Sequence, residues 1–363
     1  MIRLALIGCG GMSRSFTQRF DLVKDRIRLV AAVDPQIERA EAAASMVPGA
    51  RAETDHHRVL DGCDAGLLVL PHHLHHPIGL DFLNAGKHVL LEKPMANTEQ
   101  QCLDLIEAAD RNKRVLMIAY IMRYHPLCLA LKRAIDDGVI GNVFTMSLWT
   151  EQYTKYGGSH WVHSARTLGG GQLFSHGCHY IDLLLWYLGR PMEGSHMGTN
   201  YGTPWMEKEG TSHVTMRFES GALGYHAGTW GARGTRLMYA FHAHGERGML
   251  EAEFSSGRLL LHRNPHIDEE DFTPSPRTEL YRSEDERTGI SVLDQTPLGK
   301  QAECEMLHFV DCIENGRTPE TDGRRSLQSL QVIWRLYDAE ARSEVADLRG
   351  LGLPEIGSPI GLR

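Results

Sequence analysis

The first 120 residues of the chain alternate short apolar runs with longer amphipathic stretches. Apolar runs of strand length occupy residues 4–7, 29–33, 66–70, 88–91 and 115–119. Between several of these runs, apolar residues recur at helical spacing, over residues 37–46, 78–85 and 98–112. Strands that alternate with helices predict βαβ units, so we expect an α/β domain with a doubly wound parallel sheet over residues 1–121.

The pattern changes in the rest of the chain, residues 122–363. Strand-like runs separated by glycine-rich turns occupy residues 143–149, 212–219, 222–230, 237–244 and 248–253. Helical spacing returns at residues 126–138, 176–188, 300–315 and 323–343. Residues 264–298 are rich in proline and charged residues, and we expect them to form a solvated excursion. This pattern predicts a second, α+β domain built on a large, mainly antiparallel sheet.

Composition and charge narrow the class of protein. A chain of 363 residues is long enough for two domains, and 42% hydrophobic with 23% charged residues is ordinary for a globular protein. The net charge of −8 argues against a nucleic-acid partner, and no apolar run approaches the roughly 20 residues of a membrane span. The seven cysteines are scattered, with no CxxC pair and no secretory leader before the first strand. We therefore expect a cytoplasmic protein.

A glycine-rich turn follows the first predicted strand and opens a helix. Gly8, Gly10, Gly11 and Met12 lie in a GxGxxG-like stretch in which Ser13 replaces the third glycine. The first glycine permits the tight turn, and the second lets backbone amides approach a pyrophosphate. The helix N-terminus that follows favours the anionic diphosphate. The motif predicts a Rossmann domain that binds a dinucleotide.

Asp34 ends the second predicted strand, about 20 residues beyond the glycines, where a carboxylate binds the adenosine ribose hydroxyl. Pro35 follows it, rather than an arginine or serine that would accept a 2′-phosphate, and Arg39 is read as a surface residue of the next helix. NAD is therefore the predicted cofactor, and NADP is less favoured.

Four further stretches resemble the glucose-fructose oxidoreductase / inositol dehydrogenase (Gfo/Idh/MocA) family. They occur in the order and spacing of that family and cover nearly the whole chain. The stretches are residues 71–75 (PHHLH), residues 85–96 (AGKHVLLEKPMA), residues 123–126 (RYHP) with residues 138–141 (GVIG), and residues 169–171 (GGG) leading to residues 179–182 (HYID). The resemblance implies an NAD-dependent oxidoreductase that moves a hydride between the nicotinamide and a hydroxyl carbon of a sugar, sugar derivative or cyclitol.

Two residues carry the expected chemistry. Lys93 follows a buried strand at the edge where α/β folds bind ligands, and its ammonium can stabilise negative charge on a reacting oxygen. His179 is the expected general base, because an imidazole can accept a hydroxyl proton near neutral pH. By resemblance, Glu92 holds Lys93 and the local backbone beside the cofactor.

The chain departs from the family at position 175, which commonly carries an aspartate that supports the catalytic histidine. Ser175 stands there, one helical turn before His179 on the expected helix face, and it supplies no negative charge. Two alternatives therefore stay open: a redox-neutral glycosidase or lyase that retains NAD, and a non-enzymatic dinucleotide sensor. A sensor would need neither Lys93 nor His179.

Residues further along the chain are expected around the cofactor and substrate. By resemblance, Pro71, His72 and His75 line the nicotinamide side of the dinucleotide. The cluster of His72, His73, His75 and His76 lacks an interleaved cysteine or carboxylate, so we expect no metal site there. The expected substrate contacts, besides Lys93 and His179, are polar and aromatic: Arg123, Tyr124, Tyr153, His160, Trp161, Arg166 and His176.

A large antiparallel sheet can leave one face uncovered, and exposed apolar faces tend to become interfaces. The family resemblance points the same way. We therefore expect a homodimer or homotetramer assembled through the outer face of the C-terminal sheet.

Overall fold

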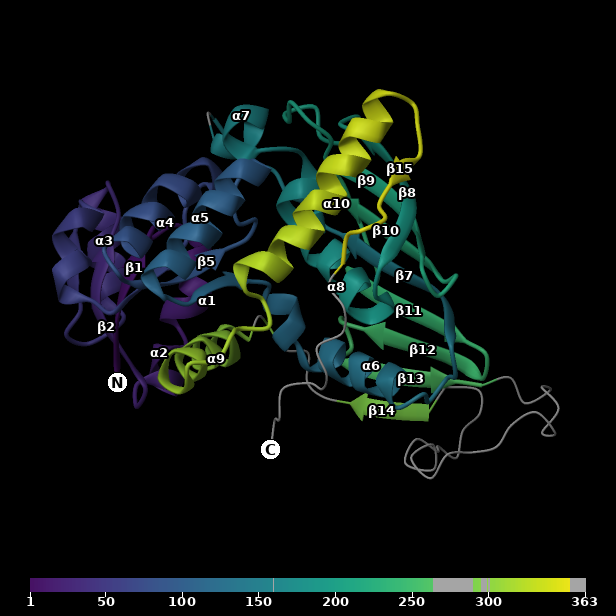
Figure 1. Ribbon diagram of the computed structural model, residues 1–363, viewed down its shortest axis with the longest axis horizontal. Helices are drawn as coiled ribbons and strands as arrows, with labels where there is room; N and C mark the ends of the chain where they lie inside the picture. The colour runs from purple at the N-terminus through teal and green to yellow at the C-terminus, as the bar shows by residue number, and fades with distance from the viewer. Residues whose placement is uncertain (159, 264–289, 295–298, 300, 353–363) are drawn as a thin grey trace.

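A computed structural model describes residues 1–158, 160–263, 290–294, 299 and 301–352 (Figure 1). Two sheets organise these residues, one of six strands and one of nine. Helix α10 (Gly323–Ala341) runs across both parts of the molecule, and packs on α5 (Glu99–Asn112) of the first part and on α8 (Cys178–Leu188) of the second.

The first sheet confirms the predicted doubly wound fold. Its strands are β1 (Ile2–Ile7), β2 (Ile27–Val33), β3 (Arg51–Glu53), β4 (Ala65–Leu68), β5 (His88–Glu92) and β6 (Leu116–Ala119). They lie in the order β3-β2-β1-β4-β5-β6, and every neighbouring pair is parallel. The order reverses between β1 and β4, so ligands are expected at the carboxyl ends of these two strands.

Helices cover both faces of this sheet. They are α1 (Arg14–Thr17), α2 (Phe20–Val23), α3 (Ile37–Ser45), α4 (His75–Asn84), α5 (Glu99–Asn112) and α9 (Ala302–Asn315). The side chains of Met306 and Phe309 on α9 lie in one apolar cluster with Phe16 and Phe20. Helix α9 thus returns from the far end of the chain to cover the first sheet, a placement that the expected division at residue 121 did not include.

The second sheet is mainly antiparallel, as predicted. Its strands are β7 (Val143–Glu151), β8 (Pro191–Thr199), β9 (Thr211–Phe218), β10 (Leu223–Thr229), β11 (Tyr239–Gly245), β12 (Gly248–Glu253), β13 (Arg258–His262), β14 (Ile290–Asp294) and β15 (Ala346–Asp347). They lie in the order β14-β13-β12-β11-β7-β10-β9-β8-β15, and only the β7–β10 pair is parallel among the described strands.

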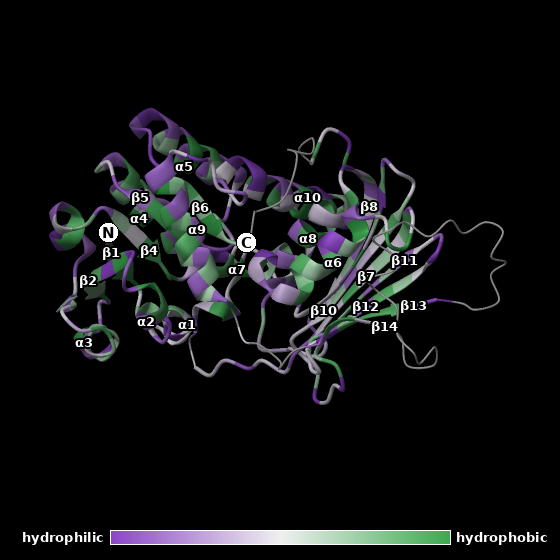
Figure 2. Cartoon of the chain, turned by 90° about the horizontal axis from the view of Figure 1, so that it is seen from below, coloured by the Kyte–Doolittle hydropathy of each residue, from purple (hydrophilic) through white to green (hydrophobic). Residues whose placement is uncertain are grey.

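One face of the second sheet is covered by α6 (Pro126–Asp136), α8 (Cys178–Leu188) and α10, which lie together on that side in Figure 2. Side chains on this inner face, such as Val214, Leu148 and Phe241, are fully buried. The alternate positions, Met197, Trp149 and Leu223, face the other way and are exposed. The period of two along each strand therefore separates a core face from an outer face.

The sequence missed several strands. β3, β8, β13, β14 and β15 were not predicted, and β14 interrupts the stretch 264–298 that was expected to be a solvated excursion. The rest of that stretch lies outside the described residues. Among the residues that the structure describes, no helix has the length and apolar character needed to cross a bilayer.

Candidate active site

The glycine turn after β1 has the shape that a dinucleotide requires. Gly8 has a φ of +91°, and a Cβ there would lie 2.1 Å from the carbonyl oxygen of Val69 at the end of β4. A Cβ on Gly10 or Gly11 would instead meet nothing within 4 Å. These two glycines therefore expose backbone over open space, at the start of the 3₁₀ turn η1 (Gly11–Ser13) that contains Met12. The cradle fits a pyrophosphate.

Ser13 and Asp34 hold this cradle. The buried Ser13 hydroxyl donates to the carbonyl oxygen of Gly10 at 2.7 Å, so serine at the third motif position is accommodated by a hydrogen bond within the turn. Asp34 is 7% exposed, and its carboxylate accepts from the backbone amides of Cys9 at 3.0 Å and Gln36 at 2.9 Å. Each carboxylate oxygen keeps a further lone pair for a ribose hydroxyl.

Glu92, Lys93 and Pro94 leave β5 at the carboxyl edge of the sheet, and the Lys93–Pro94 peptide bond is cis. One carboxylate oxygen of Glu92, Oε2, accepts from the amide of Lys93 at 3.2 Å. The other, Oε1, is buried without a hydrogen-bond partner among the described residues. An unpartnered acceptor at this edge suits a donor group of a bound dinucleotide.

Lys93 reaches across to the second part of the molecule. Its Nζ donates to the carbonyl oxygen of Ser175 at 2.9 Å. This leaves two ammonium hydrogens for a reacting oxygen. Ser175 lies in a π-helical turn (η6, Leu173–Gly177) that continues directly into α8, on which His179 stands. The contact therefore places Lys93 against the turn that leads to His179.

The π-helical turn corrects one expectation. Positions 175 and 179 were expected to be one regular α-helical turn apart, but the wider π turn changes the angle between their side chains. The backbone carbonyl of Ser175, rather than its hydroxyl, is the group that faces Lys93. His179 is 4% exposed, and its ring meets the edge of the Tyr120 ring at a centroid distance of 5.7 Å.

Two residues that the sequence did not single out hold the glycine turn before η6. The Tyr337 hydroxyl, on α10, accepts from the amides of Gly171 at 3.3 Å and Phe174 at 3.2 Å, and donates to Glu209 Oε1. A Cβ on Gly171 would lie 2.1 Å from the Glu209 carboxylate, so only glycine fits there. Burial raises the pKa of Glu209, and the Tyr337 hydroxyl opposes that shift. Glu209 and Tyr337 are far in sequence from this glycine turn, so no local sequence pattern could have linked them to it.

The loop after β4 carries Pro71, His72 and His75, the expected nicotinamide-side residues. His72 Nδ1 lies 2.8 Å from the carbonyl oxygen of Leu168, and its ring meets that of Trp161 at 4.7 Å. His75 Nδ1 lies 2.7 Å from the carbonyl oxygen of Pro94. Burial lowers the pKa of both histidines, that of His75 to about 4, so both are neutral at pH 7 and hold backbone segments together.

Arg123 and Tyr124, expected to contact the substrate, have partners inside the protein. The Arg123 guanidinium forms a bidentate ion pair with Asp182 on α8, at 2.7 and 2.8 Å, and lies 5.2 Å from the Trp186 ring. The Tyr124 hydroxyl lies 2.7 Å from His308 Nδ1 on α9. These contacts favour a structural role for both residues, one holding α8 and the other holding α9.

The remaining expected substrate contacts fall into two groups. His176 belongs to the π-helical turn that contacts Lys93 and lies among aromatic rings, with centroids at 5.1 Å to Tyr180 and 6.4 Å to Trp230. The Trp161 ring meets that of His72 edge to face. Three others sit on the more open segment that follows β7: Tyr153 is 60% exposed, His160 stacks on Tyr156 at 4.3 Å, and Arg166 is exposed.

Two parts of the chain match descriptions of a known family. Residues 2–120 match the GFO/IDH/MocA oxidoreductase family with an NAD-binding Rossmann fold, and residues 128–251 match the GFO/IDH/MocA C-terminal domain. Together these matches cover more than half of the chain.

Individual relatives are more distant. Inositol 2-dehydrogenase 2 of Saccharopolyspora erythraea is 28% identical over 234 residues, which cover 61% of this chain and 65% of that protein. D-Glucoside 3-dehydrogenase of Escherichia coli is 27% identical over 194 residues, which cover 52% of this chain and 55% of that protein. The chain therefore spans less than two thirds of the length of these curated relatives.

A solved structure shows the same fold. The WlbA dehydrogenase from Bordetella pertussis, in complex with NADH and UDP-GlcNAcA, superposes with a TM-score of 0.78 at 23% sequence identity. The superposition covers 98% of both chains, so the arrangement of the two sheets is common to both proteins.

Proposed function

The chain belongs to the Gfo/Idh/MocA oxidoreductase family, and on this basis we propose that it oxidises a secondary hydroxyl of a sugar, sugar derivative or cyclitol with NAD. The observation that carries the proposal is the contact between Lys93 Nζ and the carbonyl oxygen of Ser175, in the turn that leads to His179. It brings a cation and a candidate base to the sheet edge that also carries the glycine cradle.

Lys93 and His179 have different roles at the reacting carbon. Lys93 binds the substrate hydroxyl and stabilises negative charge on its oxygen as the proton leaves. His179 accepts that proton, and the surrounding aromatic rings keep water from the base. Bound NAD supplies the hydride acceptor, held by the cradle of Gly10 and Gly11 and by Asp34. Oxidation then yields a ketone, NADH and a proton.

The side chains expected around the substrate and the names of the relatives both point to the class of substrate. His176, Trp161 and His160 offer ring faces and hydrogen-bonding nitrogens, a combination that suits a polyhydroxylated ring. The relatives are named for inositol and for a D-glucoside.

We expect NAD reduction with at least one member of a panel of inositols, glucosides, free sugars and uronic acids, measured by absorbance. Absence of NADH with every member would contradict the proposed reaction.

We predict that the protein binds NAD more tightly than NADP. Asp34 places a buried carboxylate where a 2′-phosphate would stand, and two like charges at close range repel. Dissociation constants for both dinucleotides, measured by fluorescence titration, check this. In Asp34→Asn the ratio of the two dissociation constants should move toward one. Glu38→Gln, which neutralises an exposed carboxylate on the next helix, should leave this ratio unchanged. Equal or tighter binding of NADP by the wild type would overturn the prediction.

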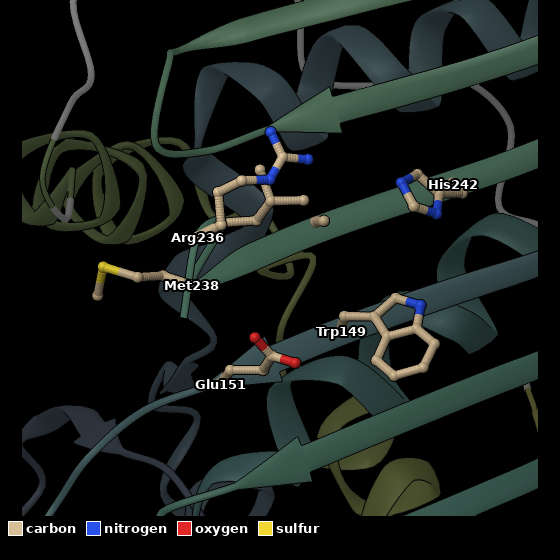
Figure 3. A pocket seen from close by; sticks show the side chains of 7 residues that line it. Trp149, Glu151, Arg236, Met238 and His242 are labelled. Carbon is tan, nitrogen blue, oxygen red and sulfur yellow. The ribbon is translucent and has the colours of Figure 1, made fainter. Parts of the chain in front are cut away.

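We predict a homodimer or homotetramer that assembles through the outer face of the nine-stranded sheet. Across this face, Trp149 is 37% exposed and Leu223 is 40% exposed, both on strands at the centre of the sheet. Figure 3 shows a shallow hollow there, between Trp149, Glu151, Arg236, Met238 and His242. It lies on the side of the sheet opposite α8 and His179, so we assign it to association rather than to chemistry.

Light scattering at micromolar concentration should give a mass of at least twice the 40.7 kDa of one chain. Trp149→Glu should shift the mass toward that of the monomer, because it replaces a large apolar side chain at the centre of the proposed interface by a charge. Leu22→Glu, which changes a more exposed apolar residue on α2 of the other part, should not. A monomeric wild type would contradict the prediction.

We also place the protein in the reducing cytoplasm. All seven cysteines are free thiols, and five of them are buried. A domain that depended on disulfides would pair such residues. Fractionation of the cells that produce it would test this location.

A further inference from the structure

Two adjacent histidines and two aspartates gather on the surface of the first domain. Asp55, His56 and His57 open the 3₁₀ turn η2 (His56–Gly62) that follows β3, and Asp81 faces them from α4. The two imidazole rings lie against each other, with centroids 4.0 Å apart. None of these four residues takes part in the proposed reaction.

The ring nitrogens converge on one carboxylate oxygen. Asp55 Oδ1 lies 2.9 Å from Nδ1 of His57 and 3.9 Å from Nδ1 of His56. The same oxygen accepts from the backbone amide of His57 at 3.0 Å, which fixes its position. Donor atoms bound to one zinc ion at 2.0–2.2 Å in a tetrahedron stand roughly 3.3 Å apart, a value that lies between the two observed distances.

Asp81 supplies a second, independent feature of a metal centre. Its Oδ2 lies 2.8 Å from Nε2 of His56, on the side of the ring away from Asp55. A carboxylate at this position draws the ring proton to Nε2 and leaves the lone pair of Nδ1 directed toward Asp55. Histidines that bind metals usually have such an outer carboxylate or carbonyl, which sets the tautomer and the ring orientation.

We propose that Asp55 Oδ1 and the Nδ1 atoms of His56 and His57 bind a divalent transition-metal ion, with Asp81 as the outer carboxylate that orients His56. Two imidazoles and one carboxylate favour Zn²⁺ or a neighbouring late transition metal over Mg²⁺ or Ca²⁺, which prefer oxygen ligands. Three protein ligands leave a fourth position for water. The ion would tie η2 to α4, the helix whose first turn carries His75.

Other groups of potential metal ligands among the described residues can be compared with this cluster. Among them, no other three His, Cys, Asp or Glu side chains bring donor atoms within 4.8 Å of one another. On the neighbouring surface, His76 Nε2 lies 3.0 Å from Asp104 Oδ2 as a single histidine–carboxylate pair. Such a pair lacks the second imidazole. It therefore serves as a control for the effect of losing one surface histidine that is paired with a carboxylate.

Titration of the full-length, untagged and chelator-treated protein with Zn²⁺ by isothermal calorimetry tests the site. The wild type should bind one ion at the highest-affinity site, and Co²⁺ should give the intense visible bands of a tetrahedral complex. His57→Gln should abolish this binding, Asp81→Asn should weaken it by roughly 10- to 100-fold, and His76→Gln should leave it unchanged. Circular dichroism and melting temperature in the absence of metal show whether each variant is folded.

Three results would overturn the proposal: no saturable Zn²⁺ binding by the wild type, equal affinity in folded His57→Gln, or an equal loss in His76→Gln. If His57→Gln does not fold, Asp55→Asn tests the same ligand set, since the amide keeps the shape but not the charge of the carboxylate. None of these measurements involves NAD or a sugar, so their outcome is separate from that of the proposed oxidoreductase activity.

Discussion

Replacement of Lys93 by methionine, or of His179 by glutamine, is expected to lower kcat by roughly 10²–10⁴-fold. Lys93→Met removes the cation that stabilises the reacting oxygen and its hydrogen bond to the Ser175 carbonyl. His179→Gln keeps a polar side chain of similar size but removes the group that accepts the proton. Steady-state kinetics with the substrate found in the panel measure both effects.

Matched controls separate chemistry from folding. Lys87→Met changes a lysine next to the opposite end of the same strand, β5, and His213→Gln changes an exposed histidine on the outer face of the second sheet. Both should keep near-normal turnover. NAD binding should be largely preserved in Lys93→Met and His179→Gln, because the pyrophosphate cradle lies on a different loop. Near-normal kcat in both active-site variants would show that the assigned roles are wrong.

Ser175 gives a finer test of the same site. Ser175→Ala should lower kcat far less than Lys93→Met does, because the backbone carbonyl that accepts the hydrogen bond from Lys93 is retained. Ser175→Asp adds a negative charge four residues before His179, which should favour the imidazolium form. Because the base must be neutral to accept a proton, the rise of kcat/KM with pH should then shift to higher pH. A defect in Ser175→Ala as deep as that of Lys93→Met would mean that the hydroxyl takes part in the chemistry.

Loss of the Asp182 carboxylate is expected to destabilise the fold by roughly 3–5 kcal/mol, because it leaves the Arg123 guanidinium buried without its counter-charge. The two side chains are 12% and 4% exposed and form both hydrogen bonds of a bidentate pair. Asp182→Ala should therefore lower the free energy of unfolding measured in urea, and with it the amount of folded α8 that presents His179.

The double variant Arg123→Met with Asp182→Leu should recover much of that loss, since it removes the stranded charge together with its partner. The exposed pair Arg217–Glu193, with side chains 54% and 53% exposed, provides the control. Glu193→Ala should change the free energy of unfolding by no more than about 1 kcal/mol. Equal effects of Asp182→Ala and Glu193→Ala would contradict a structural role for the buried pair.

Local periodicity was enough to predict most of the fold. Five of the six strands of the first sheet are buried on both faces, and their continuous apolar runs were visible in the sequence. β3 has only three residues, and β14 lies within a polar stretch, so neither produced a clear pattern. The return of α9 to the first sheet depends on long-range packing of Met306 and Phe309, which no local pattern encodes.

The positions of site residues were predictable where a sequence motif directly follows a predicted strand. Gly8, Asp34 and Lys93 lie at the carboxyl edge of the parallel sheet, as the βαβ pattern requires. The π-helical turn at Ser175 was not predictable, because its geometry depends on Glu209 and Tyr337 from distant parts of the chain. The same reason applies to Tyr124, whose partner His308 lies on α9.

The stoichiometry of NADH and oxidised product tests the central claim most directly. With saturating NAD and the active sugar or cyclitol, the account predicts one NADH for every ketone formed, and neither in Lys93→Met. Consumption of a glycoside with release of free sugar and no net NADH would contradict it, and would indicate a redox-neutral cycle in which the dinucleotide is retained.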